Sequence, residues 1–452
     1  MRNMMIGGML ALALICAPAS ADTEATWTPE TFTLENGMEV VVLPDTRAPV
    51  VTHMVWYKVG AVDEDEGKSG IAHLFEHVMF KETDDIGPEE FTSIVQRNGG
   101  QLNAFTSWDY TAYYERVAKQ HLGKMMELEA ERMTDLIIND DPEGPFISER
   151  DVVKEERRQR IDNNPGSILQ EKVLSKFWKG HPYEITVIGK MDEVNALTPQ
   201  DGMAFYEKYY SPENAILVVA GDVTAAEVKT LAEKHYGSIA PTGLVDGTRK
   251  WTKTPALTET YLIKHSDPKV RQPRWSRYYK GTSMTRDREC ALALDVGLDV
   301  LAGGMTSRLY QSLVEEQKIA IDVGAYAWTS LHDGGPVVIT GSPVEGVTLD
   351  ELEAAVMTEL RKALDEGFTD EDVVRRKNAM AASAIYARDS QTNMANEFGQ
   401  TLALGGSVDD ILNYPDDVKA VTTAQALEAV RNVFAPKEHY IEAHLLPADG
   451  EQ

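Results

Sequence analysis

Residues 69–80 read Ser69-Gly70-Ile71-Ala72-His73-Leu74-Phe75-Glu76-His77-Val78-Met79-Phe80 and predict a helix with Ser69 as its N-cap. Apolar side chains recur along this helix at helical spacing and form a stripe suited to a core: Ile71, Leu74, Phe75, Val78 and Met79. Another face carries His73, Glu76 and His77. The helix therefore combines a side that a core can bury with a side that carries ionisable groups.

The two histidines have the spacing of metal ligands. His73 and His77 are four residues apart, so both imidazoles can reach one ion at about 2.0–2.1 Å, the distance typical of zinc. Glu76 then lies beside the ion without having to bind it. A lone histidine on a helix is more often structural, but the pattern His-x-x-Glu-His is rarely met by chance. We expect zinc ligands at His73 and His77, with Glu76 as the general base.

A third ligand is expected from a second helix, because a catalytic zinc usually has three protein ligands and an open position for water. Within residues 149–156, Glu149, Val152, Val153 and Glu156 fall at i, i+3, i+4 and i+7. Two carboxylates would then share a partly buried face with two valines. Such burial is costly unless a cation receives the carboxylates.

Glu156 is the predicted third ligand, whereas Glu155 lies off the same face. Glu149, about two turns earlier, is predicted to support a ligand rather than to bind the metal. The alternative is that Glu156 only forms an ion pair with Arg160, four residues on.

These motifs resemble the inverted-zincin peptidases typified by pitrilysin, insulysin and the mitochondrial processing peptidase, over nearly the whole mature chain. In that family, His-x-x-Glu-His is followed by a distant Glu-Arg-x-x-Val-x-x-Glu helix, which residues 149–156 match. The resemblance implies one zinc per chain, Glu156 as third ligand, and peptide hydrolysis. The interval from His77 to Glu156 is slightly longer than expected for the family, so an insertion is predicted near residues 140–145.

The resemblance also implies an α+β fold with two homologous halves. Each half would be a mostly antiparallel sheet with helices packed on it, and the halves would close on the substrate as a hollow shell. Two sequence echoes agree with a duplication. Tyr57-Lys58-Val59-Gly60 recurs loosely as Tyr279-Lys280-Gly281, and a helix-Pro-strand junction at Pro212 recurs at Pro436. Chance similarity is the alternative.

Residues 237–256 contain several Pro, Gly and Thr residues with little apolar periodicity and predict a linker. We expect a catalytic zinc-binding domain at 22–236. A homologous domain without a zinc site is expected at 257–452.

Residues 99–106 add a predicted substrate site: Gly99-Gly100-Gln101-Leu102-Asn103-Ala104-Phe105-Thr106. The family has an Asn-Ala-x-Thr segment that forms an edge strand beside the metal, and such an edge can pair with an extended peptide. Asn103 and Ala104 are therefore the expected substrate contacts. A plain hairpin with residues 109–115 as its second strand is compatible with the same sequence.

Residues 1–21 have the features of a signal peptide: Arg2, an apolar run, and Ala19-Ser20-Ala21 as a cleavage site. Glycines interrupt the apolar run, which is shorter than the roughly 20 residues of a membrane span, so no membrane anchor is expected. We expect a periplasmic or secreted protein. Its mature part contains a single cysteine, Cys290, which excludes an internal disulfide.

Charge and length narrow the class of protein further. The chain has 452 residues, which fits two domains. Its 44 Lys and Arg against 72 Asp and Glu give a net charge of −28, which repels phosphate backbones and anionic lipids. Nucleic acid is therefore not an expected partner, and the expected ligand is a peptide.

The second half lacks two groups that the family resemblance would place there. Single-chain relatives carry an Arg and, seven residues later, a Tyr that stabilise the reacting carbonyl. Val314 and Ile321 stand at the matching positions, and neither side chain donates a hydrogen bond. The resemblance therefore implies a homologous, zinc-less partner chain that carries the Arg/Tyr pair. Arg308 and Tyr326 are nearby substitutes, which leaves a self-sufficient monomer or homodimer as the alternative.

A second class of function shares this fold. Some relatives are non-catalytic scaffolds in larger assemblies, and a peptide-binding shell would keep the same edge strand. The presence of all four zinc-site residues favours an enzyme.

Overall fold

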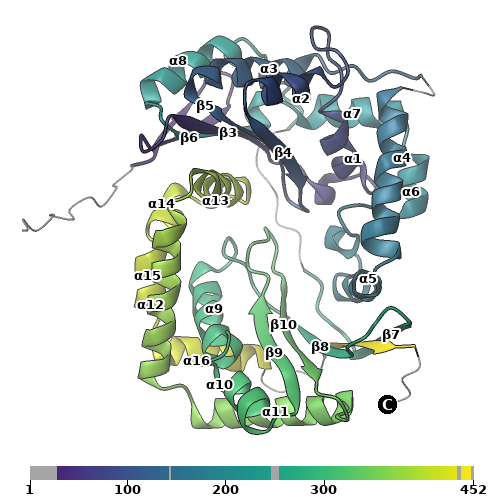
Figure 1. The fold of residues 1–452 in the computed structure, drawn as a ribbon, viewed down its shortest axis with the longest axis vertical. Helices are drawn as coiled ribbons and strands as arrows, with labels where there is room; N and C mark the ends of the chain where they lie inside the picture. The colour runs from purple at the N-terminus through teal and green to yellow at the C-terminus, as the bar shows by residue number, and fades with distance from the viewer. Residues whose placement is uncertain (1–27, 142–143, 246–253, 435–438, 449–452) are drawn as a thin grey trace, which may run out of the picture.

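The computed structural model of the protein describes residues 28–141, 144–245, 254–434 and 439–448. The expected signal peptide at 1–21 lies outside these residues, as do Pro436 and part of the expected linker. Within the described residues, no helix is both long and apolar enough to cross a membrane. Two sheets dominate the fold, one in each half of the chain (Figure 1).

The first sheet has six strands, of which only β2 and β6 pair in parallel. Their spatial order is β1 (Glu30–Thr33), β2 (Glu39–Pro44), β6 (Ala215–Gly221), β3 (Val50–Tyr57), β5 (Thr111–Ala118) and β4 (Gln101–Thr106). Val55 faces one core of this sheet, whereas Met54 and Trp56 face another on the opposite side. Because both faces are covered, β3 and β6 are apolar along most of their length.

Eight helices belong to the first half in the described residues. They are α1 (Ile71–Val78), α2 (Glu90–Arg97), α3 (Leu122–Thr134), α4 (Pro145–Arg157), α5 (Pro165–Phe177), α6 (Met191–Ala196), α7 (Pro199–Tyr209) and α8 (Ala225–His235). Helices α1, α3, α7 and α8 share the main core with one face of the sheet. This packing fixes the helix that carries the two histidines against the sheet.

The second sheet repeats the strand order of the first, without a counterpart of β1. The order is β7 (Tyr261–Asp267), β11 (Ile441–Pro447), β8 (Arg274–Lys280), β10 (Pro336–Pro343) and β9 (Ala320–Ala327). Again one pair, β7 with β11, is parallel. Tyr57 ends β3 and Tyr279 lies near the end of β8, at equivalent places in the two sheets. The chain therefore has the α+β fold with two halves of one topology that the sequence predicted.

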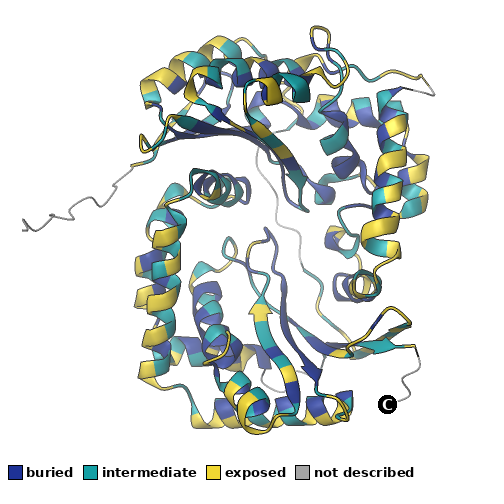
Figure 2. Cartoon of the chain, viewed as in Figure 1, coloured by how far each residue is buried: buried dark blue, intermediate teal, exposed yellow. Residues whose placement is uncertain are grey.

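Eight helices belong to the second half in the described residues, and not all of them pack on its own sheet. They are α9 (Arg288–Ala302), α10 (Arg308–Tyr310), α11 (Leu349–Glu366), α12 (Asp370–Ala387), α13 (Gln391–Ala403), α14 (Val408–Leu412), α15 (Tyr414–Ala420) and α16 (Thr423–Phe434). Figure 2 shows the inner strands of both sheets largely buried, with exposed residues on the outer strands and on the outward faces of the helices.

Each half contributes one helix to the sheet of the other half (Figure 1). Helix α13 packs on β3 and β6, where Phe398 and Trp56 belong to one buried cluster. Helix α5 packs on β7 and β11, where Phe177 and Ile441 belong to another. The two halves therefore share cores and are not merely tethered by a linker.

Candidate metal centre

Helix α1 begins differently from the prediction. Ser69 is not its N-cap; Gly70 holds that position with φ 89°, and the Ser69 hydroxyl accepts a hydrogen bond from the Lys190 amide at 3.0 Å. The first amides of the helix, at Gly70 and Ala72, donate instead to Oε1 of Glu64, each at 3.0 Å. The prediction failed because a buried carboxylate from an earlier turn supplies the cap, which local sequence does not reveal.

The faces of α1 are those predicted. The apolar stripe is buried, with Ile71 the most exposed member at 3%: Ile71, Leu74, Phe75, Val78 and Met79. His73, Glu76 and His77 all line a cavity of about 710 Å³. Burial of the stripe thus orients the ionisable face of the helix toward that cavity.

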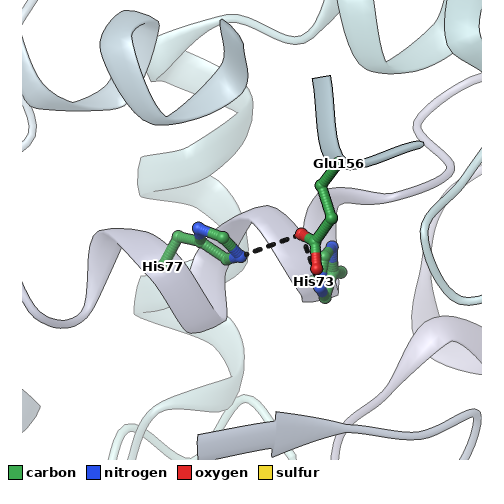
Figure 3. A group of neighbouring side chains, drawn as sticks. All are labelled: His73, His77 and Glu156. Atoms are coloured by element: carbon green, nitrogen blue, oxygen red, sulfur yellow. Dashed lines mark ion pairs between the residues drawn. The ribbon is translucent and has the colours of Figure 1, made fainter. Parts of the chain in front are cut away.

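Glu156 of α4 meets both histidines across the cavity (Figure 3). Its Oε2 lies 3.6 Å from His73 Nε2 and 3.4 Å from His77 Nε2. Its other oxygen, Oε1, lies 2.7 Å from an Arg160 nitrogen. The ligand role and the Arg160 ion pair are therefore compatible, because each uses a different oxygen of the carboxylate.

The register of α4 agrees with the prediction except at Val152. Glu149 and Val153 are buried, Glu156 is half-buried, and the Glu155 side chain is 56% exposed. Val152, expected in the buried stripe, is 46% exposed. Helix α4 packs on α1 and α6 along the side of Val153, so Val152 lies at the outer margin of that face.

The Glu149 carboxylate contacts His77 and does not reach the point where the three candidate ligand atoms meet. Its Oε2 lies 3.1 Å from His77 Nδ1, and its Oε1 lies 2.8 Å from Lys81 Nζ. A proton on His77 Nδ1 that is donated to Glu149 leaves Nε2 free to bind a metal. Sequence reasoning did not single out Lys81, which holds Glu149 in this position.

Glu76 is held by a residue of the edge strand. The Thr106 hydroxyl donates to Glu76 Oε2 at 2.7 Å, which leaves Oε1 free of that bond. Burial raises the pKa of Glu76 above its usual range, although the Thr106 hydrogen bond acts in the opposite direction. A carboxylate with a raised pKa is a better proton acceptor. Thr106 belongs to the predicted substrate segment, residues 99–106, but nothing in that sequence indicates its contact with Glu76.

β4 is the edge strand of the first sheet, and Asn103 and Ala104 both line the cavity. Just beyond β4, the Ser107 amide donates to the Tyr110 carbonyl, so residues 107 and 110 form a hydrogen-bonded pair. Hydrogen-bonded and non-hydrogen-bonded pairs alternate along antiparallel strands, so Ala104 stands at a position not hydrogen-bonded to β5. The Ala104 amide is in contact with Asn103 Oδ1 at 3.0 Å. The backbone of Ala104 therefore points toward the free edge, where an extended peptide can pair.

The three candidate ligands fit a zinc ion. Ligands about 2.0–2.1 Å from a tetrahedral ion lie about 3.4 Å apart, close to the 3.4 and 3.6 Å separations of Glu156 Oε2 from the imidazole nitrogens. All three ligand atoms lie within 4.8 Å of one another. Glu156 Oε2 is buried and has no hydrogen-bond partner among the described residues. A cation between these atoms satisfies that oxygen.

The electrostatics of the site agree with this fit. Burial lowers the pKa of His73 to about 4, and His77 adds to the effect. Burial also lowers the pKa of His77, but Glu149 and Glu156 outweigh it and raise the pKa to about 9. The two carboxylates therefore attract a cation, and a proton competes with a metal ion for His77 Nε2.

Two other groups of side chains in the described residues could in principle hold a metal: His53, Glu115 and Glu129, and Glu353, Glu442 and His444. In the first group, Arg132 forms an ion pair with Glu129. In the second, Arg277 lies 2.6 Å from Glu442. Since an arginine already neutralises carboxylates in both groups, neither needs a metal ion.

Comparison with known proteins agrees with this geometry. The family model described as insulinase (peptidase family M16) matches residues 40–190, and the model described as peptidase M16 inactive domain matches residues 196–380. The chain belongs to peptidase family M16. The cavity lined by His73, His77 and Glu156 lies within the part that the first model matches, and the second half is matched mainly by the second model.

Individual family members cover most of the chain. Zinc protease PqqE of Helicobacter pylori is 33% identical over 82% of this chain and 83% of its own. The uncharacterized zinc protease YmxG of Bacillus subtilis is 25% identical over 92% of this chain and 98% of its own. The crystal structure of a protease from Helicobacter pylori superposes with a TM-score of 0.85 at 29% identity, over 93% of this chain and all of that one.

Proposed function

We propose that the chain is the catalytic subunit of a zinc-dependent endopeptidase or oligopeptidase that hydrolyses peptides or unfolded segments. One observation carries this proposal. His73, His77 and Glu156 place three ligand atoms within 4.8 Å of one another, and Glu76 lines the same cavity. The names of the family members similar to this chain, which call them zinc proteases, support the choice of metal.

The residues divide the chemistry among them. Bound zinc would supply a Lewis acid that polarises the scissile carbonyl and makes a water more acidic. Glu76 takes a proton from the attacking water and delivers it to the nitrogen of the leaving amine. Thr106 orients this carboxylate by its bond to Oε2. The free edge at Ala104 binds the peptide backbone. Because water is the nucleophile, the protein forms no covalent bond to the substrate.

The proposal includes a homologous partner chain without zinc ligands. Val314 lies in the segment Gln311–Glu316 after α10, and Ile321 lies near the start of β9. Figure 1 places α10 and the start of β9 at the opposite end of the molecule from α1. Arg308 bonds the Gly367 carbonyl at 2.7 Å and pairs with Glu366. This placement supports a divided site, in which another chain brings an Arg/Tyr pair to the zinc.

The proposed location is the periplasm or the extracellular space. Support comes from the signal-peptide features of residues 1–21.

Metal content and peptide hydrolysis together test the proposal. The purified protein, with and without the homologous chain, is incubated with a mixed peptide pool, and zinc is measured by mass spectrometry. We expect one zinc per chain and cleavage that a chelator abolishes. Zinc or peptide binding without cleavage under both conditions would instead identify a non-catalytic peptide-binding or scaffold subunit.

A further inference from the structure

Two loops from opposite halves meet beside the metal cavity. One is the turn between β4 and β5, with Trp108 and Asp109; the other is residues 328–335, between β9 and β10. The His332 amide donates a hydrogen bond to Asp109 Oδ2 at 3.1 Å. The rings of Trp108 and Trp328 pack with their centroids 6.0 Å apart. The second half therefore contacts the end of the strand that lines the cavity.

Tyr183 joins the same two loops. Its hydroxyl lies 2.8 and 2.7 Å from the two Asp109 oxygens and accepts from the Asp333 amide at 3.2 Å. Burial, reinforced by Asp109, raises the pKa of Tyr183 far above its usual value, so the hydroxyl stays protonated and donates. Asp333 also lies 3.0 Å from His181 Nε2. No member of this network is more than 4% exposed, so water does not compete for its bonds.

Both loops are anchored in their own halves. The His332 carbonyl accepts a hydrogen bond from the Ser283 hydroxyl at 3.1 Å. On the other side, the Val62 amide donates to the Trp108 carbonyl at 2.9 Å. Because each loop is bonded to its own half, the contact between the loops sets the position of the second half relative to the β4–β5 turn of the first.

The turn controls the wall of the cavity. Thr106, which holds Glu76, lies two residues before Trp108, and both Thr106 and Trp108 line the cavity. The Trp108 indole donates to the Ile185 carbonyl at 2.8 Å, next to residues 186–188 of another wall. A shift of Asp109 would therefore move the end of β4 and the free edge behind it.

We propose that the second half positions the substrate-binding edge of the first, with Asp109 as the positioning residue. This inference rests on the function proposed above. The half without zinc ligands then has a task within its own chain: it holds β4 where an extended peptide pairs with it. Substrates long enough to lie along β4 depend on this contact, whereas short substrates that reach little beyond the cleavage site do not.

Asp109→Asn in the full chain tests the inference, in the presence of the homologous chain if activity requires it. Asparagine has an NH2 group in place of one carboxylate oxygen, so residue 109 loses one of its two acceptors for the bonds from Tyr183 and His332. We expect KM for a long peptide to rise about fivefold, as the loss of one buried hydrogen bond allows. KM for a short peptide, and the zinc content, should stay within twofold of the wild type.

Asp389→Asn is the matched control. Asp389 also joins the two halves, through Arg47 at 2.9 Å, but it is exposed and does not line the cavity. This variant should leave KM unchanged for both peptides. Equal changes for long and short peptides in Asp109→Asn, or no change in either, would overturn the inference.

If Asp109→Asn does not fold, Tyr183→Phe tests the same inference. It removes the hydroxyl that bonds both loops, and the same dependence on peptide length is expected. A uniform effect on both peptides would again overturn the inference. Failure of the proposed function would look different, because the wild type itself would then lack zinc or cleave neither peptide.

Discussion

Gly399 on α13 lies against the indole of Trp56 on β3, so close that a β-carbon at residue 399 would stand 2.0 Å from Trp56 Nε1. Trp56 is 1% exposed and cannot move aside without disturbing the cluster that it shares with Tyr110 and Phe398. This contact joins the two halves at the center of a shared core.

Gly399→Ala should therefore destabilise the protein. Overpacking of this kind costs about 1–3 kcal/mol, measured as the loss in free energy of unfolding by urea. Gly324→Ala on β9 is the control, because nothing lies within 4 Å of a β-carbon there. A Gly399→Ala variant as stable as the control would show that α13 does not pack on β3 as described.

Glu76→Gln should keep the metal and lose hydrolysis. An amide cannot take a proton from water, and the removal of a general base typically lowers the rate by about 10²–10⁴-fold. Zinc content by mass spectrometry and kcat on a peptide pool are the two measurements. An active, zinc-loaded Glu76→Gln protein would show that another group is the base.

Glu156→Gln and Glu155→Gln form a matched pair on α4. Glu156 faces both imidazoles, whereas Glu155 is exposed and pairs with Arg158 at 3.0 Å. We expect strong loss of zinc in the first variant and retention in the second, measured by competition with a chelator. The reverse order would mean that the ligand assignment on this helix is wrong.

Lys280 should make stability depend on pH. Burial lowers its pKa to about 7, from 10.5 in the unfolded chain. Between these values the unfolded state binds more protons, so stability increases as pH rises from about 7 toward 10 and is lost as pH falls back through the folded pKa.

The slope is at most ~1.4 kcal/mol per pH unit. The Phe177 ring, whose centroid lies 3.7 Å from the ammonium, favours the charged form and so narrows the pH range in which stability changes. Lys280→Met is the comparison, because it cannot titrate. Urea unfolding at pH 7, 8 and 9 should show the wild type gaining on the variant at each step. A constant difference between the two would contradict the assignment.

The divided site predicts that a second chain raises activity. The isolated protein should hydrolyse peptides slowly per bound zinc, and a homologous, co-exported chain without His-x-x-Glu-His should raise turnover. A missing oxyanion donor can cost about 10²–10³ in kcat. The rise should vanish when the partner's Arg or Tyr is changed. High turnover alone, unchanged on addition, would favour a self-sufficient monomer or homodimer.

Much of the candidate site could be predicted because it depends on local helical spacing. His73 and His77 are four residues apart, and Glu149 and Glu156 are seven residues apart. These offsets set which side chains share a face, whatever surrounds the helix. The same reasoning failed for Val152, because periodicity gives the centre of a buried face better than its margins.

The remaining features depend on partners distant in the sequence. Glu64 replaces Ser69 as the cap of α1, and Thr106 reaches Glu76, through contacts that no local pattern announces. Helical periodicity also cannot tell which sheet a helix covers. The sequence therefore does not predict that α5 packs on the second sheet and α13 on the first.

The exchange of α5 and α13 has a consequence for biosynthesis. A ribosome that has completed the strands of the first sheet has not yet made α13, so the face with Val41, Trp56 and Ile216 has no cover. Such late, non-local contacts slow folding and expose apolar surface to aggregation. A gene that encoded only the metal-binding half would leave this face open permanently. The need to cover it is a physical reason for the chain to retain its second half.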